Sequence, residues 1–116
     1  MPLIKVQTSA IIDFDQKAFI LKQLSEQLAI QINKPEAYVM TVLDSEVAMT
    51  FGGTFDPACY IEIKSIGILT PEQTKTMTLI FCELIEQTLD VPRSRTYIEF
   101  TNAIGSMWGW NGDTFG

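Results

Sequence analysis

The stretch that decides the fold runs from Ala58 to Pro92 and reads ACYIEIKSIGILTPEQTKTMTLIFCELIEQTLDVP. From Ala58 to Lys64, apolar and polar side chains alternate, which predicts a strand with one buried face. Thr70-Pro71-Glu72-Gln73 predicts a helix start, because Thr caps the first turn, Pro suits the first helical position and Gln completes a capping box. Asp90-Val91-Pro92 ends this helix, since proline cannot continue it, and a further strand is predicted over Tyr97 to Thr101.

The first half of the chain repeats this order. Strands are predicted over Leu3 to Thr8 and Tyr38 to Leu43, and the helix between them starts at Asp13, with Gln16 completing a capping box. Asn33-Lys34-Pro35 ends that helix. Apolar residues at helical spacing predict two buried stripes, which are Phe14, Ala18, Leu21, Leu24, Leu28 and Ile32 in the first helix and Met77, Ile80, Phe81, Leu84, Ile85 and Leu89 in the second.

We therefore predict one α/β (α+β) domain over residues 1–116, made of duplicated β-α-β units at about 1–53 and 58–116. A short crossover makes the two strands of a unit parallel and puts its helix on one face. Two units joined edge to edge give a four-stranded mixed sheet with both helices on one face. The other face is half apolar, which favours burial in an oligomer. In the tail, Trp108 and Trp110 are expected to pack on a neighbouring subunit or to rim a pocket.

The composition excludes several classes of function. Eight Lys and Arg against 14 Asp and Glu give a net charge of −6, which argues against nucleic acid or an anionic membrane as partner. The chain has no histidine, which removes Ser-His-Asp and Cys-His catalysis and nearly every catalytic zinc site. We predict no metal and no cofactor. Cys59 and Cys82 are interpreted as two reduced, buried thiols.

Two further absences bear on location. No apolar run approaches the roughly 20 residues that a membrane span needs. The segment Met1-Pro2-Leu3-Ile4-Lys5 lacks the basic stretch and long apolar core of a signal peptide. We therefore expect a soluble, cytoplasmic protein.

Without histidine, one candidate base is the chain terminus. Removal of Met1 would leave Pro2 with a free secondary amine on its ring. An α-amino group has a reference pKa of about 7.7–8, and an apolar pocket lowers that pKa by penalising the charged form. A terminal proline would then be neutral near pH 7 and could act as a general base. If Met1 stays, the nitrogen of Pro2 is an amide without basicity.

Several short stretches also match a known family in their order and spacing. They are Met1-Pro2, Lys34-Pro35, Phe51-Gly52-Gly53, Ser65-Ile66-Gly67, Tyr97-Ile98, Gly109-Trp110-Asn111 and Thr114-Phe115. On these residues the chain resembles the macrophage migration inhibitory factor family of the tautomerase superfamily over essentially its whole length. The resemblance implies a homotrimer whose three sheets form a central barrel, with the active site at the subunit interface.

The same resemblance implies a keto-enol tautomerase, an isomerase acting on aryl α-keto acids such as phenylpyruvate or on dopachrome analogues. By family analogy, Pro2 is the catalytic base. Lys34 would bind the substrate carboxylate or carbonyl oxygen, helped by the backbone N–H of Ile66. Tyr97 of a neighbouring chain would add a hydrogen bond and an aromatic wall, and the tail around Trp108 would close the apolar side of the pocket.

Two departures from the family pattern qualify these expectations. Vertebrate members carry a CxxC associated with thiol oxidoreductase activity, whereas this chain has only Cys59 in that stretch, so that activity is not predicted. The family commonly has Asn where this chain has Glu99, which strand alternation places on the face of Tyr97. An ionised Glu99 in the pocket would repel an anionic substrate and raise the pKa of Pro2, unless Lys34 or an arginine neutralises it.

Two alternatives remain at the level of sequence. One is a cytokine-like protein-binding module on the same trimeric scaffold, with weak or vestigial catalysis. For this alternative, the family analogy implies a protein receptor and non-classical secretion. The other is hydration or dehalogenation of an unsaturated acid, which needs additional arginines and a carboxylate that activates water. Glu99 could be that carboxylate, whereas Arg93 and Arg95 precede the last strand and are expected to face solvent.

Overall fold

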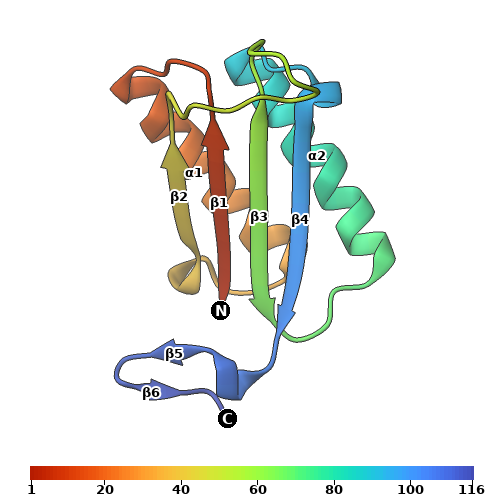
Figure 1. Ribbon diagram of the computed structural model, residues 1–116. Helices are drawn as coiled ribbons and strands as arrows, with labels where there is room; N and C mark the ends of the chain where they lie inside the picture. Colours follow the sequence, from red (N-terminus) through yellow and green to blue (C-terminus); the bar gives the residue numbers. More distant parts are fainter.

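The computed structural model describes residues 1–116 and places four long strands and two helices in the predicted order (Figure 1). The first unit comprises β1 (Pro2–Thr8), α1 (Phe14–Ile32), a short 3-10 turn η1 (Glu36–Tyr38) and β2 (Met40–Asp44). The second comprises β3 (Cys59–Ile66), α2 (Pro71–Leu89), the 3-10 turn η2 (Arg93–Arg95) and β4 (Thr96–Ala103). The tail consists of the 3-10 turn η3 (Gly105–Met107) and a hairpin of β5 (Gly109–Trp110) and β6 (Asp113–Thr114).

The four long strands form one mixed sheet in the order β2-β1-β3-β4. β1 is parallel to β2 and β3 is parallel to β4, as a β-α-β unit requires, while β1 and β3 run antiparallel where the units meet. Both helices cover the same face of the sheet (Figure 1). The predicted fold class is confirmed. Neither helix is long and apolar enough to cross a membrane.

The helix boundaries follow the predicted signals. Asp13 and Gln16 form a reciprocal capping box at the start of α1, and Thr70 and Gln73 form another at the start of α2. α1 ends at a left-handed Asn33, with φ 58° and ψ 51°, where the short polar side chain is better tolerated than a bulky one. This capping fixes where Lys34 leaves the helix.

The core lies between the sheet and the two helices. The face of β1 that carries Ile4 and Val6 and the face of β3 that carries Ile61 and Ile63 are fully buried. The helices close this layer with Ile20, Leu24, Leu28 and Ile32 from α1 and Met77, Phe81, Cys82 and Ile85 from α2.

Two details differ from prediction. In α1, Ile20 is buried, while Phe14, the first helical residue, is 81% exposed and Ala18 is exposed as well. From Ile20 onward, every fourth residue of α1 is buried. Leu21 is rotated by about 100° around the helix axis from Ile20 and is only half-buried. In addition, β2 starts at Met40 rather than Tyr38, because Pro35 and Glu36 accept the hydrogen bonds of a 3-10 turn.

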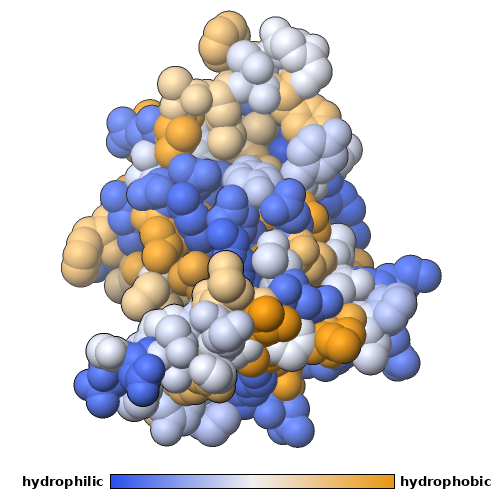
Figure 2. Space-filling view, turned by 60° about the horizontal axis from the view of Figure 1, so that its bottom comes forward, coloured by the Kyte–Doolittle hydropathy of each residue, from blue (hydrophilic) through white to orange (hydrophobic).

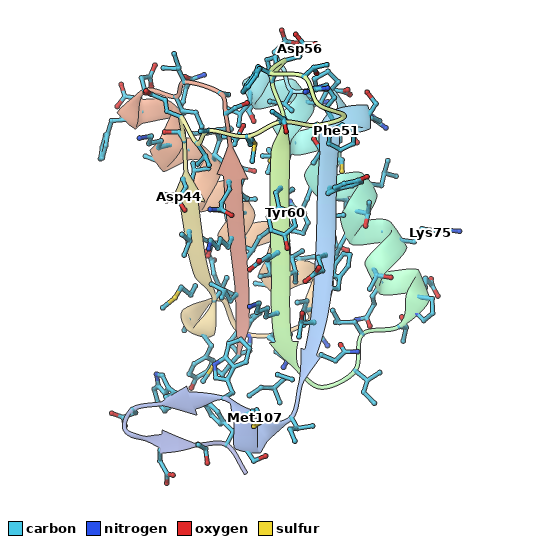
Figure 3. The ribbon with its side chains drawn as sticks, in the orientation of Figure 1. Asp44, Phe51, Asp56, Tyr60, Lys75 and Met107 are labelled. Carbon is cyan, nitrogen blue, oxygen red and sulfur yellow. The ribbon has the colours of Figure 1, made fainter.

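The other face of the sheet is not covered by the helices. The register aligns Val42, Lys5, Glu62 and Glu99 in one row across it and Asp44, Gln7, Tyr60 and Tyr97 in the next. The Tyr60 hydroxyl donates to Oε1 of Glu62 at 3.1 Å, and Nζ of Lys64 lies 3.7 Å from Oε2 of the same residue. Figure 3 shows Tyr60 on this open face. The face is therefore polar in its centre and apolar toward β2.

Candidate active site

Pro2 begins β1 and its side chain is buried on the helix-covered face. It pairs across the sheet with Ser65, near the end of β3. The N terminus and the tail hairpin lie at this same end of the sheet (Figure 1). The site is therefore built where β1 begins, β3 ends and the tail folds back.

Lys34 reaches this end from the end of α1. Its backbone N–H donates to the carbonyl of Ala29 at 3.0 Å, which closes the left-handed helix end and fixes the direction of the chain. The side chain then extends across the sheet end, where Nζ donates to the carbonyl oxygen of Ile66 at 2.8 Å. A single chain thus brings Lys34 and Ile66 together beside Pro2. The carbonyl of Ile66 accepts the hydrogen bond that the Lys34 ammonium donates.

Electrostatics at the start of β1 favour an uncharged amine. Burial lowers the pKa of the Met1 amino group below its ordinary value, and the positive charge and hydrogen bonding of Lys34 lower it further. Pro2 is the next residue and is itself buried, so burial would also act on an amine carried by Pro2.

Ser65 is a member of this cluster to which sequence reasoning assigned no role. Its side chain is 1% exposed, and its hydroxyl lies 3.4 Å from the carbonyl oxygen of Ile66. That carbonyl therefore accepts from both Lys34 and Ser65. The signal was present in the alternation of β3, which puts Ser65 on the buried face among apolar residues.

Aromatic side chains gather beside the same end of the sheet. The ring of Trp110 meets Tyr38 edge-on at 6.1 Å and stacks on Phe115 at 6.1 Å. Trp108 is half-buried, and its carbonyl accepts the backbone N–H of Phe115 at 3.2 Å. Met107 ends η3 and is 77% exposed, and it lies in the tail below the sheet (Figure 3). Figure 2, which brings this end forward, shows apolar side chains gathered among hydrophilic ones.

The tail hairpin was not predicted, although its signal stands in the sequence. Asn111 and Gly112 have φ of 52° and 82°, the backbone that a two-residue hairpin turn requires and that Asn-Gly favours. The same geometry occurs at Gly52 and Gly53, with φ of 59° and 77°, between paired Phe51 and Thr54. The tail hairpin, with Asn111 and Gly112 at its turn, places Trp110 in contact with Tyr38.

Tyr97 and Glu99 lie on the open face, away from Pro2. The register places Tyr97 in the row of Gln7, five positions along β1 from Pro2. At about 3.3 Å per residue this is roughly 17 Å along the strand. Both side chains are exposed, and Tyr97 packs on Phe51 with a ring separation of 4.8 Å. One chain therefore brings together Pro2, Lys34 and Ile66 but not Tyr97 or Glu99.

The two cysteines are buried and free. Burial, with a smaller contribution from Cys82, raises the pKa of the Cys59 thiol to about 12. A thiol with that pKa is a poor nucleophile at neutral pH. No three or more Cys, Asp or Glu side chains gather closely enough to hold a metal ion.

Comparison with known proteins agrees with the observed fold. A family model described as "Macrophage migration inhibitory factor (MIF)" matches residues 1–116. The chain is 34% identical over 116 residues to the "Macrophage migration inhibitory factor homolog" of Brugia malayi, covering 100% of both. It is 30% identical over 115 residues to the Xenopus laevis "Macrophage migration inhibitory factor", covering 99% of both. The solved homologue from Prochlorococcus marinus is 45% identical with a TM-score of 0.93, over 98% of this chain and 99% of that one.

Proposed function

The chain belongs to the macrophage migration inhibitory factor family, and on that premise we propose that it is a keto-enol tautomerase acting on aryl α-keto acids, with Pro2 as general base. The observation that carries the proposal is the contact of Lys34 with Ile66 beside the start of β1, where the pKa of the terminal amine is lowered.

The chemistry follows from these groups. Once Met1 is removed, the neutral amine of Pro2 takes a proton from the carbon next to the ketone, and negative charge moves to the carbonyl oxygen. The ammonium of Lys34 stabilises that charge where it develops. An ammonium has three N–H donors, and the Ile66 carbonyl occupies one, which leaves others for the substrate. The protonated amine of Pro2 then gives the proton to that oxygen, which completes the enol and regenerates the neutral base.

The apolar part of the pocket is proposed to come from the tail. Tyr38, Trp110 and Phe115 form a continuous aromatic surface that suits a phenyl ring. Trp108 is proposed to add to this wall. The exposure of Trp110, 55% in the single chain, leaves ring surface free for a ligand.

The complete site is proposed to form in a homotrimer. Tyr97 and Glu99 lie on an open sheet face and are exposed in one chain, so each would reach a pocket only in an assembly. We propose that a neighbouring chain supplies both residues, Tyr97 as a hydrogen-bond donor and Glu99 as a nearby negative charge.

The test is ketonisation of phenylpyruvate followed by ultraviolet absorbance, on protein whose intact mass shows that Met1 is absent. Turnover that falls to background in Pro2→Gly supports Pro2 as the base. A Lys22→Gln variant, altered on the exposed side of α1, is the matched control and keeps full activity. Protein lacking Met1 that turns over no aryl keto acid would instead favour protein binding on the same scaffold.

A further inference from the structure

Arg95 organises the loop that precedes β3. Its Nε donates to the carbonyl of Pro57 at 2.9 Å, and its two terminal nitrogens donate to the carbonyls of Phe51 at 3.1 Å, Thr54 at 3.3 Å and Asp56 at 2.9 Å. All four acceptors belong to residues 51–57, which we name the clasped loop. One guanidinium therefore holds four backbone carbonyls, and two of them, those of Phe51 and Thr54, also accept hydrogen bonds within the Phe51–Thr54 turn.

The same side chain also fixes a ring of the clasped loop. The guanidinium carbon of Arg95 lies 5.4 Å from the centre of the Phe51 ring, within the range of a cation–π contact. Phe51 in turn packs on Tyr97 at 4.8 Å. Figure 3 shows Phe51 and Asp56 in this loop at the end of the sheet opposite the tail.

This packing forms one wall of a hollow on the open face. A cavity of about 430 Å³ is lined by Phe51 and Tyr97 together with Met49, Tyr60 and neighbouring residues of the loop and β3. Tyr97 has no side-chain hydrogen bond within the chain, and its ring packs on the ring of Phe51. Its orientation therefore depends on where the clasped loop is held.

We propose that Arg95 is a positioning residue for Tyr97, acting through Phe51 and the clasped loop. The inference rests on the proposed function in one respect, since it takes Tyr97 to complete the substrate site of a neighbouring chain. Arg95 touches no part of the Pro2 cluster and does not alter the base. Its effect is on how well the site binds the substrate.

The role requires arginine rather than any cation. A guanidinium has five N–H donors in a rigid plane, which matches four carbonyls arranged around it, whereas lysine has three donors at one point. The chain offers a matched control two positions earlier. Arg93 is exposed and pairs with Glu86 of α2 at 3.1 Å, away from the loop.

The first readout is kinetic. In Arg95→Lys we expect KM for phenylpyruvate to rise about tenfold while kcat and the pH profile stay unchanged, because the base is not disturbed. Arg93→Lys should leave KM unchanged. Tyr97→Phe should then add less to KM in the Arg95→Lys background than in the parent, because the ring is already displaced. The inference would be overturned if Arg95→Lys and Arg93→Lys changed KM equally. It would also be overturned if the effects of Arg95→Lys and Tyr97→Phe on KM were fully additive.

The second readout does not need activity. The chain has three tyrosines, so protein labelled with 3-fluorotyrosine gives three fluorine resonances, and Tyr97→Phe assigns one of them. We expect the Tyr97 resonance alone to move in Arg95→Lys and in Phe51→Leu, and to stay in Arg93→Lys. Phe51→Leu reports only the ring contact, so Arg95→Gln, which keeps two N–H donors, is the second variant if Arg95→Lys does not fold. An unmoved Tyr97 resonance overturns the inference, whereas an inactive parent protein contradicts only the proposed function.

Discussion

The ammonium nitrogen of Lys34 lies 2.8 Å from the carbonyl oxygen of Ile66, 32 positions away in the sequence. The contact joins the end of α1 to the end of β3 across the first residues of β1. Because it places a positive charge next to the chain terminus, it connects the fold directly to the ionisation of the terminal amine.

Lys34→Gln should both raise the pKa of the base and remove the charge that stabilises the enolate. Burial and Lys34 lower the amine pKa from its ordinary value, so parent activity should rise as the amine loses its proton at a pH below that ordinary pKa and then stay level. In the variant the rise shifts to higher pH, and kcat falls roughly 100-fold. The measurement is the pH dependence of phenylpyruvate turnover, and an unshifted acid limb would be inconsistent with this role.

Glu99→Asn should improve the binding of anionic substrates. In the proposed trimer, Glu99 places a negative charge in a pocket that receives a carboxylate, and its removal should lower KM about three- to tenfold. Glu62→Gln is the matched control, because Glu62 lies beside Glu99 in the same row but is already paired with Lys64. If both variants change KM equally, the effect belongs to the general charge of the face.

Trp110→Ala should weaken binding of aryl substrates selectively. The ring of Trp110 joins Tyr38 to Phe115, so its loss opens the aromatic surface. We expect KM for phenylpyruvate to rise about tenfold and KM for a small aliphatic keto acid to change by less than about twofold. The comparison of the two substrates in one variant is the measurement, and an equal rise for both would argue for a general loss of structure.

Ile20→Ala and Phe14→Ala should separate the buried row of α1 from its exposed side. Ile20 is fully buried, so its truncation should lower the free energy of unfolding by about 2–5 kcal/mol. Phe14 is 81% exposed, and its replacement should change that free energy by no more than about 0.5 kcal/mol. Urea unfolding of the two variants tests this, and a larger loss in Phe14→Ala than in Ile20→Ala would place the apolar stripe where the sequence alone puts it.

Local signals made most of the fold predictable. Both capping boxes, at Asp13 and Thr70, and the alternation in β3 depend on residues within a few positions of one another. The rotation of α1 that buries Ile20 was missed, because apolar residues stand on both sides of that helix and only packing on the sheet chooses between them.

The site was less predictable than the fold. The position of Lys34 just after a helix follows from a local sequence signal. Its carbonyl partner Ile66 belongs to the other β-α-β unit, so their contact depends on the order of the strands in the sheet. The expectation that Arg95 faces solvent was wrong, since it binds four carbonyls of a loop about 40 positions earlier, for example Asp56 at 2.9 Å. Arg93, in contrast, does face solvent.

The most direct test compares the chain lacking Met1 with a variant that carries one alanine inserted before Pro2. The two proteins keep every side chain of the site, but in the variant the nitrogen of Pro2 is an amide and cannot accept a proton. Intact mass establishes each N terminus, and phenylpyruvate ketonisation is measured on both at pH 7. The account predicts turnover in the first and none above background in the second. Equal turnover in the two would contradict Pro2 as the base.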